Sequence, residues 1–166
     1  TLFERPGHAR RVSIKYGARQ PGELCFRRQY DDWAARPGVD LTPTIKGIWL
    51  TLDGEGIDFQ AGQYINLMVP GLTQPRAFSI ASPPSRRDEI ELHVRLVDGG
   101  AATAWLHREL KPGQRLRFTA PLGRFFVRRS RPGPMIFLAG GSGLSSPKSM
   151  IDNLLEDGEQ RPMTLV

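Results

Sequence analysis

The feature that most constrains this fold is a change in the spacing of apolar residues along the chain. Between residues 42 and 123, short segments alternate apolar and polar side chains, which is the pattern of strands with one buried face. The segment "MIFLAG" at 135–140 is instead continuously apolar, as in a buried parallel strand. The two patterns together predict an antiparallel β unit followed by the start of an α/β unit.

Five alternating segments predict the strands of the first unit. They are short and are separated by glycine or proline turns, which favours an antiparallel barrel or sandwich. In the clearest of them, "DEIELHVRLV", alternation puts the apolar residues Ile90, Leu92, Val94 and Leu96 on one face. The expected strands are 42–52, 62–71, 76–84, 88–97 and 113–123.

Helical spacing predicts one helix inside the β unit and one after it. The first, at 99–110, is entered through glycines and spaces Ala101, Ala104, Trp105 and Leu110. After the linker "RRSRPGP" come the apolar run, an amphipathic helix at 145–158 stopped by Gly158, and a strand at 162–166. This order is the opening of a doubly wound nucleotide-binding fold. The apolar residues expected to point inward are Met150, Ile151, Leu154 and Leu155.

The composition limits the kinds of ligand or macromolecule that this protein is expected to bind. The net charge is +6, but the arginines are scattered rather than gathered in one stripe with aromatic residues. We therefore expect no nucleic acid, and instead an anionic ligand or an acidic protein partner. The lone cysteine, Cys25, excludes an intramolecular disulfide and an all-cysteine iron–sulfur cluster within this chain; it is either a reactive thiol or a small hydrophobic residue.

No targeting or membrane-spanning signal is visible. The basic N-terminal residues are not followed by an apolar run, so they do not form a signal peptide. No apolar run approaches the roughly 20 residues of a membrane helix. We expect a cytoplasmic protein with no membrane partner.

A glycine-rich turn separates the apolar run from the helix that follows. Gly140, Gly141 and Gly143 would let backbone amides approach a ligand, and Ser142 adds a hydroxyl donor. Because the turn opens a helix, it indicates a site for an anion or a dinucleotide. The alternative is a plain tight turn capped by serine.

Two further segments have the chemistry of a phosphate site. Arg76 and Phe78 share one face of a strand and could clamp a phosphate beside a planar ring, with Ser79 on the other face. The alternative is an exposed arginine next to a core phenylalanine. The helix after Gly99 has no acidic residue in its first turn, where Thr103 lies, so it could receive a second phosphate or be a structural helix entry.

The sequence shows no group of residues arranged for acid–base catalysis. His8, His93 and His107 lack metal-ligand spacing, and we expect no metal site. No Ser-His-Asp arrangement and no paired carboxylates suggest hydrolysis. A protein with two phosphate sites and no such groups leaves the chemistry to its cofactors.

The segments from about Asp40 to Val166 resemble the ferredoxin–NADP reductase superfamily, and more narrowly the reductase components of bacterial phenol hydroxylases and related monooxygenases. The motifs follow the family's order and spacing. They are "DLTPTIKGIWLTLD", "FQAGQYINLMVPG", "RAFSIASPP", "ELHVRLVDGGAAT", "PLGRFFVR" and "FLAGGSGLSSPKSMI". The resemblance implies a Greek-key, antiparallel FAD-binding β barrel at 41–131 and a partial α/β nucleotide-binding unit at 132–166.

The resemblance also implies roles for individual residues. Arg76 would meet the FAD pyrophosphate, Phe78 would lie against the isoalloxazine, and Ser79, near flavin N5, would be the catalytic residue. The family more often has Tyr where this chain has Phe78. The remaining implied contacts are His93, Val94 and Arg95 for the flavin and its ribityl chain, Gly100, Ala101, Ala102 and Thr103 for the pyrophosphate, and Gly140, Gly141, Ser142 and Gly143 for the nicotinamide dinucleotide.

Residues 1–40 depart from the family's order. The family has a ferredoxin-like domain there, whereas "HARRVSIKYGARQPGELCFRRQ" resembles a displaced strand and helix of the nicotinamide domain. An engineered chimera, a natural permutation, and recruitment of this segment to replace a missing barrel strand are the alternatives, of which we favour the chimera. We expect a strand at 11–16, pairing within the barrel rather than beside 135–139, and a mostly helical 22–35.

The resemblance predicts an FAD-binding electron-transfer reductase module. It would accept hydride from NAD(P)H and pass electrons toward an iron–sulfur centre of a monooxygenase system, with a ferredoxin domain or an oxygenase as partner. Because the nicotinamide unit is incomplete, we expect NADH binding to be weak or lost. The alternative is a non-catalytic recombined chimera, which could form a segment-swapped oligomer.

Overall fold

The computed structural model describes residues 12–14, 39–41 and 44–166. The first two stretches are strands, β1 (Val12–Ile14) and β2 (Val39–Leu41), and they pair with each other in parallel. The strand expected at 11–16 is thus confirmed, but its expected pairing is wrong, because β1 joins neither the barrel strands nor residues 135–139. The helix expected at 22–35 lies outside the described residues.

All five strands expected in the β unit are present. Each is shorter than the alternating segment that predicted it. The strands are β3 (Ile45–Thr51), β4 (Tyr64–Met68), β5 (Arg76–Ser79), β6 (Glu89–Arg95) and β7 (Arg117–Leu122). We call residues 44–122 the sheet unit.

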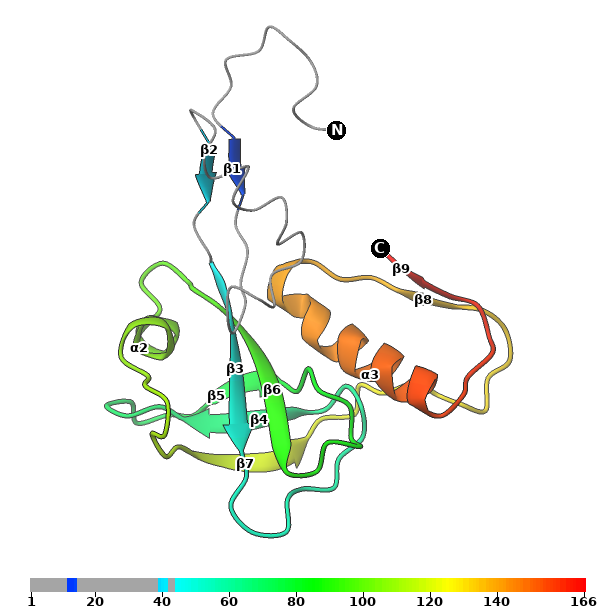
Figure 1. Cartoon of the computed structure of the whole chain (residues 1–166), viewed down its shortest axis with the longest axis horizontal. Helices are drawn as coiled ribbons and strands as arrows, with labels where there is room; N and C mark the ends of the chain where they lie inside the picture. The colour runs from blue at the N-terminus through cyan, green and yellow to red at the C-terminus, as the bar shows by residue number, and fades with distance from the viewer. Residues whose placement is uncertain (1–11, 15–38, 42–43) are drawn as a thin grey trace, which may run out of the picture.

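The strands of the sheet unit form two antiparallel sheets. One contains β3 and β6, and the other has the order β5-β4-β7. A single bridge between Ile80 and Leu92 joins the end of β5 to β6. In Figure 1 the β3–β6 pair crosses the other sheet. The expected antiparallel architecture is confirmed, and among the described strands no pairing that closes the two sheets into a barrel is detected.

The larger hydrophobic core lies between these two sheets. The inward positions of β4, Ile65 and Leu67, are fully buried. In β6 the alternation correctly predicted the burial of Ile90, Leu92 and Val94, whereas Leu96 after the strand is only partly buried. Burying side chains of this size contributes about 1.5–3 kcal/mol each, so this core supplies most of the stability of the sheet unit.

Helix α2 (Ala101–Arg108) packs against the same core, as the spacing in 99–110 predicted. Its most buried residues are Ala102 and Leu106, one position later than expected. Ala101 is exposed, and Trp105 is only partly buried against the core. The spacing of apolar residues thus predicted the helix but not which of its faces is buried.

The C-terminal residues form the expected strand–helix–strand unit. Strand β8 (Met135–Phe137) leads through a 3₁₀ turn, η2 (Gly141–Leu144), into α3 (Ser145–Glu156), and β9 (Met163–Leu165) returns parallel to β8. We call residues 135–165 the C-terminal unit. Gly158 has a φ of +73°, which ends the helix as its sequence position predicted.

Helix α3 lies between the sheet unit and the β8–β9 pair (Figure 1). It therefore covers only one face of that pair. The apolar run was expected to be buried on both faces, and this expectation is correct for one face and wrong for the other. Phe137 points to α3 and is buried, whereas Ile136 and Leu138 are 69% and 74% exposed. Leu155, expected to point inward, is 58% exposed. No helix in the described part of the chain is both long and apolar enough to cross a membrane.

Candidate functional site

Strand β5 presents the arginine and the aromatic ring that the sequence singled out. Arg76 is exposed, and its Nη1 donates to the carbonyls of Gln74 and Pro75 at 3.1 and 3.2 Å. No acidic residue among those described pairs with it, so its positive charge remains open to a ligand. Phe78 is partly buried against the larger core. The pair is thus compatible with both interpretations of this strand, a phosphate clamp and an exposed arginine beside a core ring.

The end of β5 lies next to the middle of β6. The Ile80–Leu92 bridge is antiparallel, and the amide of Ala81 donates to the carbonyl of Glu91 at 2.7 Å. Continuing this register backwards along β5 brings Ser79 toward His93. Two of the predicted flavin-binding segments therefore meet at one end of the sheet unit.

The three predicted residues of β6 differ in their surroundings. His93 is partly buried, and its Nε2 lies 2.8 Å from Oε1 of Glu91. Val94 is fully buried, and its carbonyl lies 2.8 Å from Nε2 of His107 on α2. Because a carbonyl only accepts, His107 donates this bond and ties α2 to β6. Arg95 is exposed.

The start of α2 has free amide donors. Gly100 is the N-cap and makes no side-chain cap, and the first turn contains no acidic residue. The hydroxyl of Thr103 is already used, because it donates to the carbonyl of Gly100 and accepts from the amide of Val97. The first amides of the helix, including those of Ala101 and Ala102, have no intrahelical acceptor and can meet an anion.

The other end of α2 is neutralised by a lysine. Nζ of Lys46 donates to the carbonyls of Leu106 and His107, at 3.2 and 3.4 Å. A cation at the carboxyl end of a helix offsets the negative end of the helix dipole. The uncompensated charge of α2 is therefore at its start, next to β6.

The glycine turn comes to the same end of the sheet unit. It lies against β6, and a Cβ added at Gly141 would be 3.8 Å from Cδ1 of Ile45. Ile45 is opposite Arg95 in the β3–β6 ladder. Gly140 and Gly143 face open space, and the carbonyl of Ser142 accepts a bond of 2.8 Å from the Ser145 hydroxyl. The end of β5, the second half of β6 and the glycine turn thus lie close together, although they come from three parts of the sequence.

A buried ionic cluster next to this end was not predicted. Nζ of Lys148 on α3 lies 3.0 Å from Oε2 of Glu91 and 3.0 Å from Oδ2 of Asp152. The Glu91 side chain is only 8% exposed. Burial alone would raise its pKa, but hydrogen bonds from His93 and Lys148 outweigh burial and lower the pKa of Glu91 to about 2. Burial likewise disfavours the charged form of Lys148, yet Asp152 and Glu91 raise its pKa above the ordinary value.

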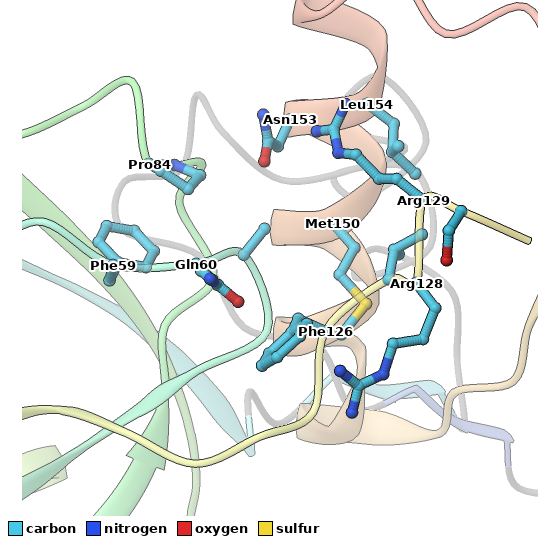
Figure 2. A pocket seen from close by; sticks show the side chains of 12 residues that line it. Phe59, Gln60, Pro84, Phe126, Arg128, Arg129, Met150, Asn153 and Leu154 are labelled. Atoms are coloured by element: carbon cyan, nitrogen blue, oxygen red, sulfur yellow. The ribbon is translucent and has the colours of Figure 1, made fainter.

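A cavity of about 460 Å³ lies apart from the predicted cofactor residues, where α3 meets the loop before β4 and the linker after β7 (Figure 2). It is lined by residues that include Phe59, Gln60, Phe126 and Met150, and by none of the predicted cofactor residues. The Arg128 guanidinium lies 4.5 Å from the centre of the Phe126 ring. Within the described ranges no three His, Cys, Asp or Glu side chains gather as metal ligands.

Comparison with known proteins identifies the sheet unit. The oxidoreductase FAD-binding domain family matches residues 43–127. The reductase component DmpP of phenol 2-monooxygenase from Pseudomonas sp. (strain CF600) is 60% identical over 127 residues, which are 76% of this chain and 36% of that protein. The phenol hydroxylase P5 protein of Acinetobacter pittii (strain PHEA-2) is 56% identical over 126 residues, which are 76% of this chain and 35% of that protein. The chain thus spans about a third of the length of these relatives.

Solved structures share the fold. The cytochrome P450 reductase GcoB of Amycolatopsis superposes with a TM-score of 0.68 at 35% identity, over 74% of this chain and 38% of that chain. Phthalate dioxygenase reductase, at 22% identity, has a TM-score of 0.66 over 74% of this chain and 38% of that chain. The strand order of the sheet unit and the C-terminal unit is therefore one that reductases use.

Proposed function

Because the chain belongs to the oxidoreductase FAD-binding domain family, of the ferredoxin–NADP reductase type, we propose that it is the FAD-binding module of an NAD(P)H-dependent reductase. The module would serve a monooxygenase system and pass electrons toward an iron–sulfur centre. The observation that supports this most is the convergence of β5, β6 and the glycine turn at one end of the sheet unit. A flavin and a dinucleotide held at that end would be neighbours.

The residues present fit a diphosphate-bearing flavin. Arg76 has an unpaired charge among the described residues, and the start of α2 presents amides with no acidic neighbour in the first turn. These are the two kinds of donor that a pyrophosphate needs. We assign the pyrophosphate to Arg76 and to the helix start formed by Gly100, Ala101, Ala102 and Thr103.

The remaining roles follow from position on β5 and β6. We assign Phe78 to the face of the isoalloxazine, where its ring can stack, and Ser79 to the neighbourhood of flavin N5 as the catalytic residue. His93, Val94 and Arg95 would flank the flavin and its ribityl chain. Since the Val94 carbonyl already bonds His107, we expect contacts at this position to use the other backbone groups of β6.

The glycine turn would hold the nicotinamide dinucleotide. Gly140, Gly141 and Gly143 leave room for a ligand's phosphates near the backbone, and Ser142 is partly exposed. Bound FAD would supply the redox chemistry, accepting a hydride and releasing electrons one at a time. The part of this chain is to align the nicotinamide with the flavin and to exclude water between them.

The proposed domain boundaries follow from these assignments. Residues 41–131 would be the FAD-binding domain and 132–166 the first strand, helix and strand of the nicotinamide domain. No comparison supports the alternative hypothesis of a recombined, non-catalytic chimera. Residues 1–40 lie before the family match, which begins at residue 43.

Titration of the purified chain with FAD tests the proposal. We expect saturable quenching of flavin fluorescence and a yellow protein. Arg76→Ala should weaken binding about tenfold or more, because a charge-assisted bond to phosphate contributes about 1.5–3 kcal/mol. Arg86→Ala is the matched control, since Arg86 is exposed in the turn after β5 and has no proposed role. Unchanged flavin fluorescence in the unsubstituted protein would refute FAD binding.

A further inference from the structure

Helix α3 is joined to the sheet unit by side chains along its first two turns. The Ser146 hydroxyl donates to the carbonyl of Gly62 at 3.4 Å, and the Ser149 hydroxyl donates to the carbonyl of Ser82 at 2.6 Å. Between them, Lys148 reaches the sheet unit with its ammonium group. We call these contacts of Ser146, Lys148 and Ser149 the α3 seam.

Lys148 makes the only ion pair of the α3 seam within the described part of the chain. Its ammonium donates to Oε2 of Glu91 at 3.0 Å and to the carbonyl of Ala81 at 3.3 Å. Glu91 is buried, so its charge depends on this cation and on His93. Lys148 is partly exposed, but Glu91 is buried, so removing the ammonium leaves the Glu91 carboxylate with His93 as its remaining partner; this costs more than losing a pair of exposed charges.

The α3 seam also fixes the glycine turn. The turn η2 ends at Leu144 and α3 begins at the next residue, so a shift of α3 along β6 would move the turn by the same amount. Within the turn, Gly141 lies beside Ile45, which is opposite Arg95 at the last residue of β6; β5 meets the same strand three residues earlier, at Leu92. The distance between the proposed dinucleotide site and the proposed flavin site is therefore set by how α3 docks.

We infer that Lys148 is a positioning residue: its bonds to Glu91 and Ala81 hold the glycine turn against the flavin-binding strands and thereby align nicotinamide with flavin. The kinetic part of this inference rests on the proposed function, whereas the structural part does not. A misplacement of about 1 Å can cost on the order of a hundredfold in rate, so a side chain remote from the reacting atoms can control hydride transfer.

Three substitutions isolate the contact between the units. Lys148→Met keeps the length of the side chain but removes the ammonium, and Lys148→Arg restores a cation. Asp152→Asn is the matched control, because Asp152 bonds the same ammonium at 3.0 Å from within α3 and makes no hydrogen bond or ion pair with the described residues of the sheet unit. Glu91 is unsuitable for this test, since it also holds His93.

The first measurement needs no cofactor. Amide hydrogen exchange of residues 141–156 should be at least about tenfold faster in Lys148→Met, which corresponds to ~1.4 kcal/mol. Exchange in β4 should be unchanged, Asp152→Asn should match the unsubstituted protein, and Lys148→Arg should restore most of the protection. Ser149→Ala, which removes the 2.6 Å bond to Ser82, should add to the effect of Lys148→Met.

The second measurement uses the FAD-loaded protein. In anaerobic stopped-flow reduction by NADH, the limiting rate of flavin reduction should fall about tenfold or more in Lys148→Met, while FAD affinity stays within about twofold. A loss confined to stability would leave this limiting rate unchanged, so the split between rate and affinity separates positioning from mere folding.

The outcomes distinguish this inference from the proposed function. Unchanged exchange in Lys148→Met, or an equal effect of Asp152→Asn, would overturn the structural part. Faster exchange with an unchanged limiting rate would overturn the positioning role. If the unsubstituted chain does not bind FAD, or if saturating NADH does not reduce its flavin, the proposed function and the positioning role both fail, while the exchange measurement still decides whether Lys148 holds α3.

Discussion

The buried carboxylate of Glu91 should make folding stability depend on pH in the acidic range. Its pKa lies near 2 in the folded protein instead of the ordinary 4.5, because His93 and Lys148 bond the charged form more strongly than burial disfavours it. The difference between these values, at about 1.4 kcal/mol for each pKa unit, amounts to about 3 kcal/mol of folding free energy. Since the folded pKa is the lower one, this stabilisation is present above about pH 4.5 and is lost as the pH falls toward 2.

Urea unfolding of Glu91→Gln at several pH values measures this contribution. At pH 7 we expect the variant to be less stable than the unsubstituted protein by up to about 3 kcal/mol. The difference should shrink as the pH approaches 2, where Glu91 of the unsubstituted protein also becomes neutral. Effects of other carboxylates cancel, because both proteins contain them.

Glu89→Gln provides the control on the same strand, since Glu89 makes no ion pair with any described residue. It should change stability by less than about 0.5 kcal/mol at any pH. A Glu91→Gln protein that is as stable as the parent at pH 7 would refute the reasoning. A stability difference that stays constant between pH 7 and pH 3 would refute it as well.

Two other substitutions test the packing and the helix. Gly62→Ala should destabilise the protein by about 2 kcal/mol or more, because φ is +100° and the new methyl group would overlap the Phe125 carbonyl and the Met150 side chain. Gly54→Ala, at a φ of +90° in open space, should cost only about 1 kcal/mol in the same thermal unfolding assay; equal costs would contradict this account. Lys46→Met should destabilise by about 1 kcal/mol by freeing the last carbonyls of α2, and calorimetry showing no change would mean that water replaces the ammonium.

Periodicity predicted the elements of this protein well, and their surroundings less well. Alternation located β3 to β7, because a strand with one buried face repeats every two residues. It also placed Ile90, Leu92 and Val94 in the core. The apolar run at 135–140 predicted a strand buried on both faces, but a sheet covered by one helix leaves Ile136 exposed. The sequence pattern shows which residues are apolar, but it does not show whether one face or both faces of a strand pair are covered by other secondary-structure elements.

The candidate site was predictable in part. Glycines, an arginine and a helix start are local signals, and they located the segments that the structure brings to one end of the sheet unit. The resemblance to reductases, and not the pattern, supplied the roles of Phe78 and Ser79, which remain predictions. The pair of Glu91 and Lys148 left no local signal, because 57 positions separate the two residues. Such a contact becomes visible only when α3 is docked on β6.

The two hydrophobic clusters are unequal, and their order along the chain has a consequence for synthesis. Every buried member of the larger cluster lies between Ile48 and Leu106, whereas the smaller cluster joins Ala61 to Phe137, Met150 and Leu154. On a ribosome the larger core can therefore assemble while α3 is still being made. The nascent sheet unit would present a hydrated, charged Glu91 until residues 145–156 emerge, and α3 would then add to a surface that is already folded.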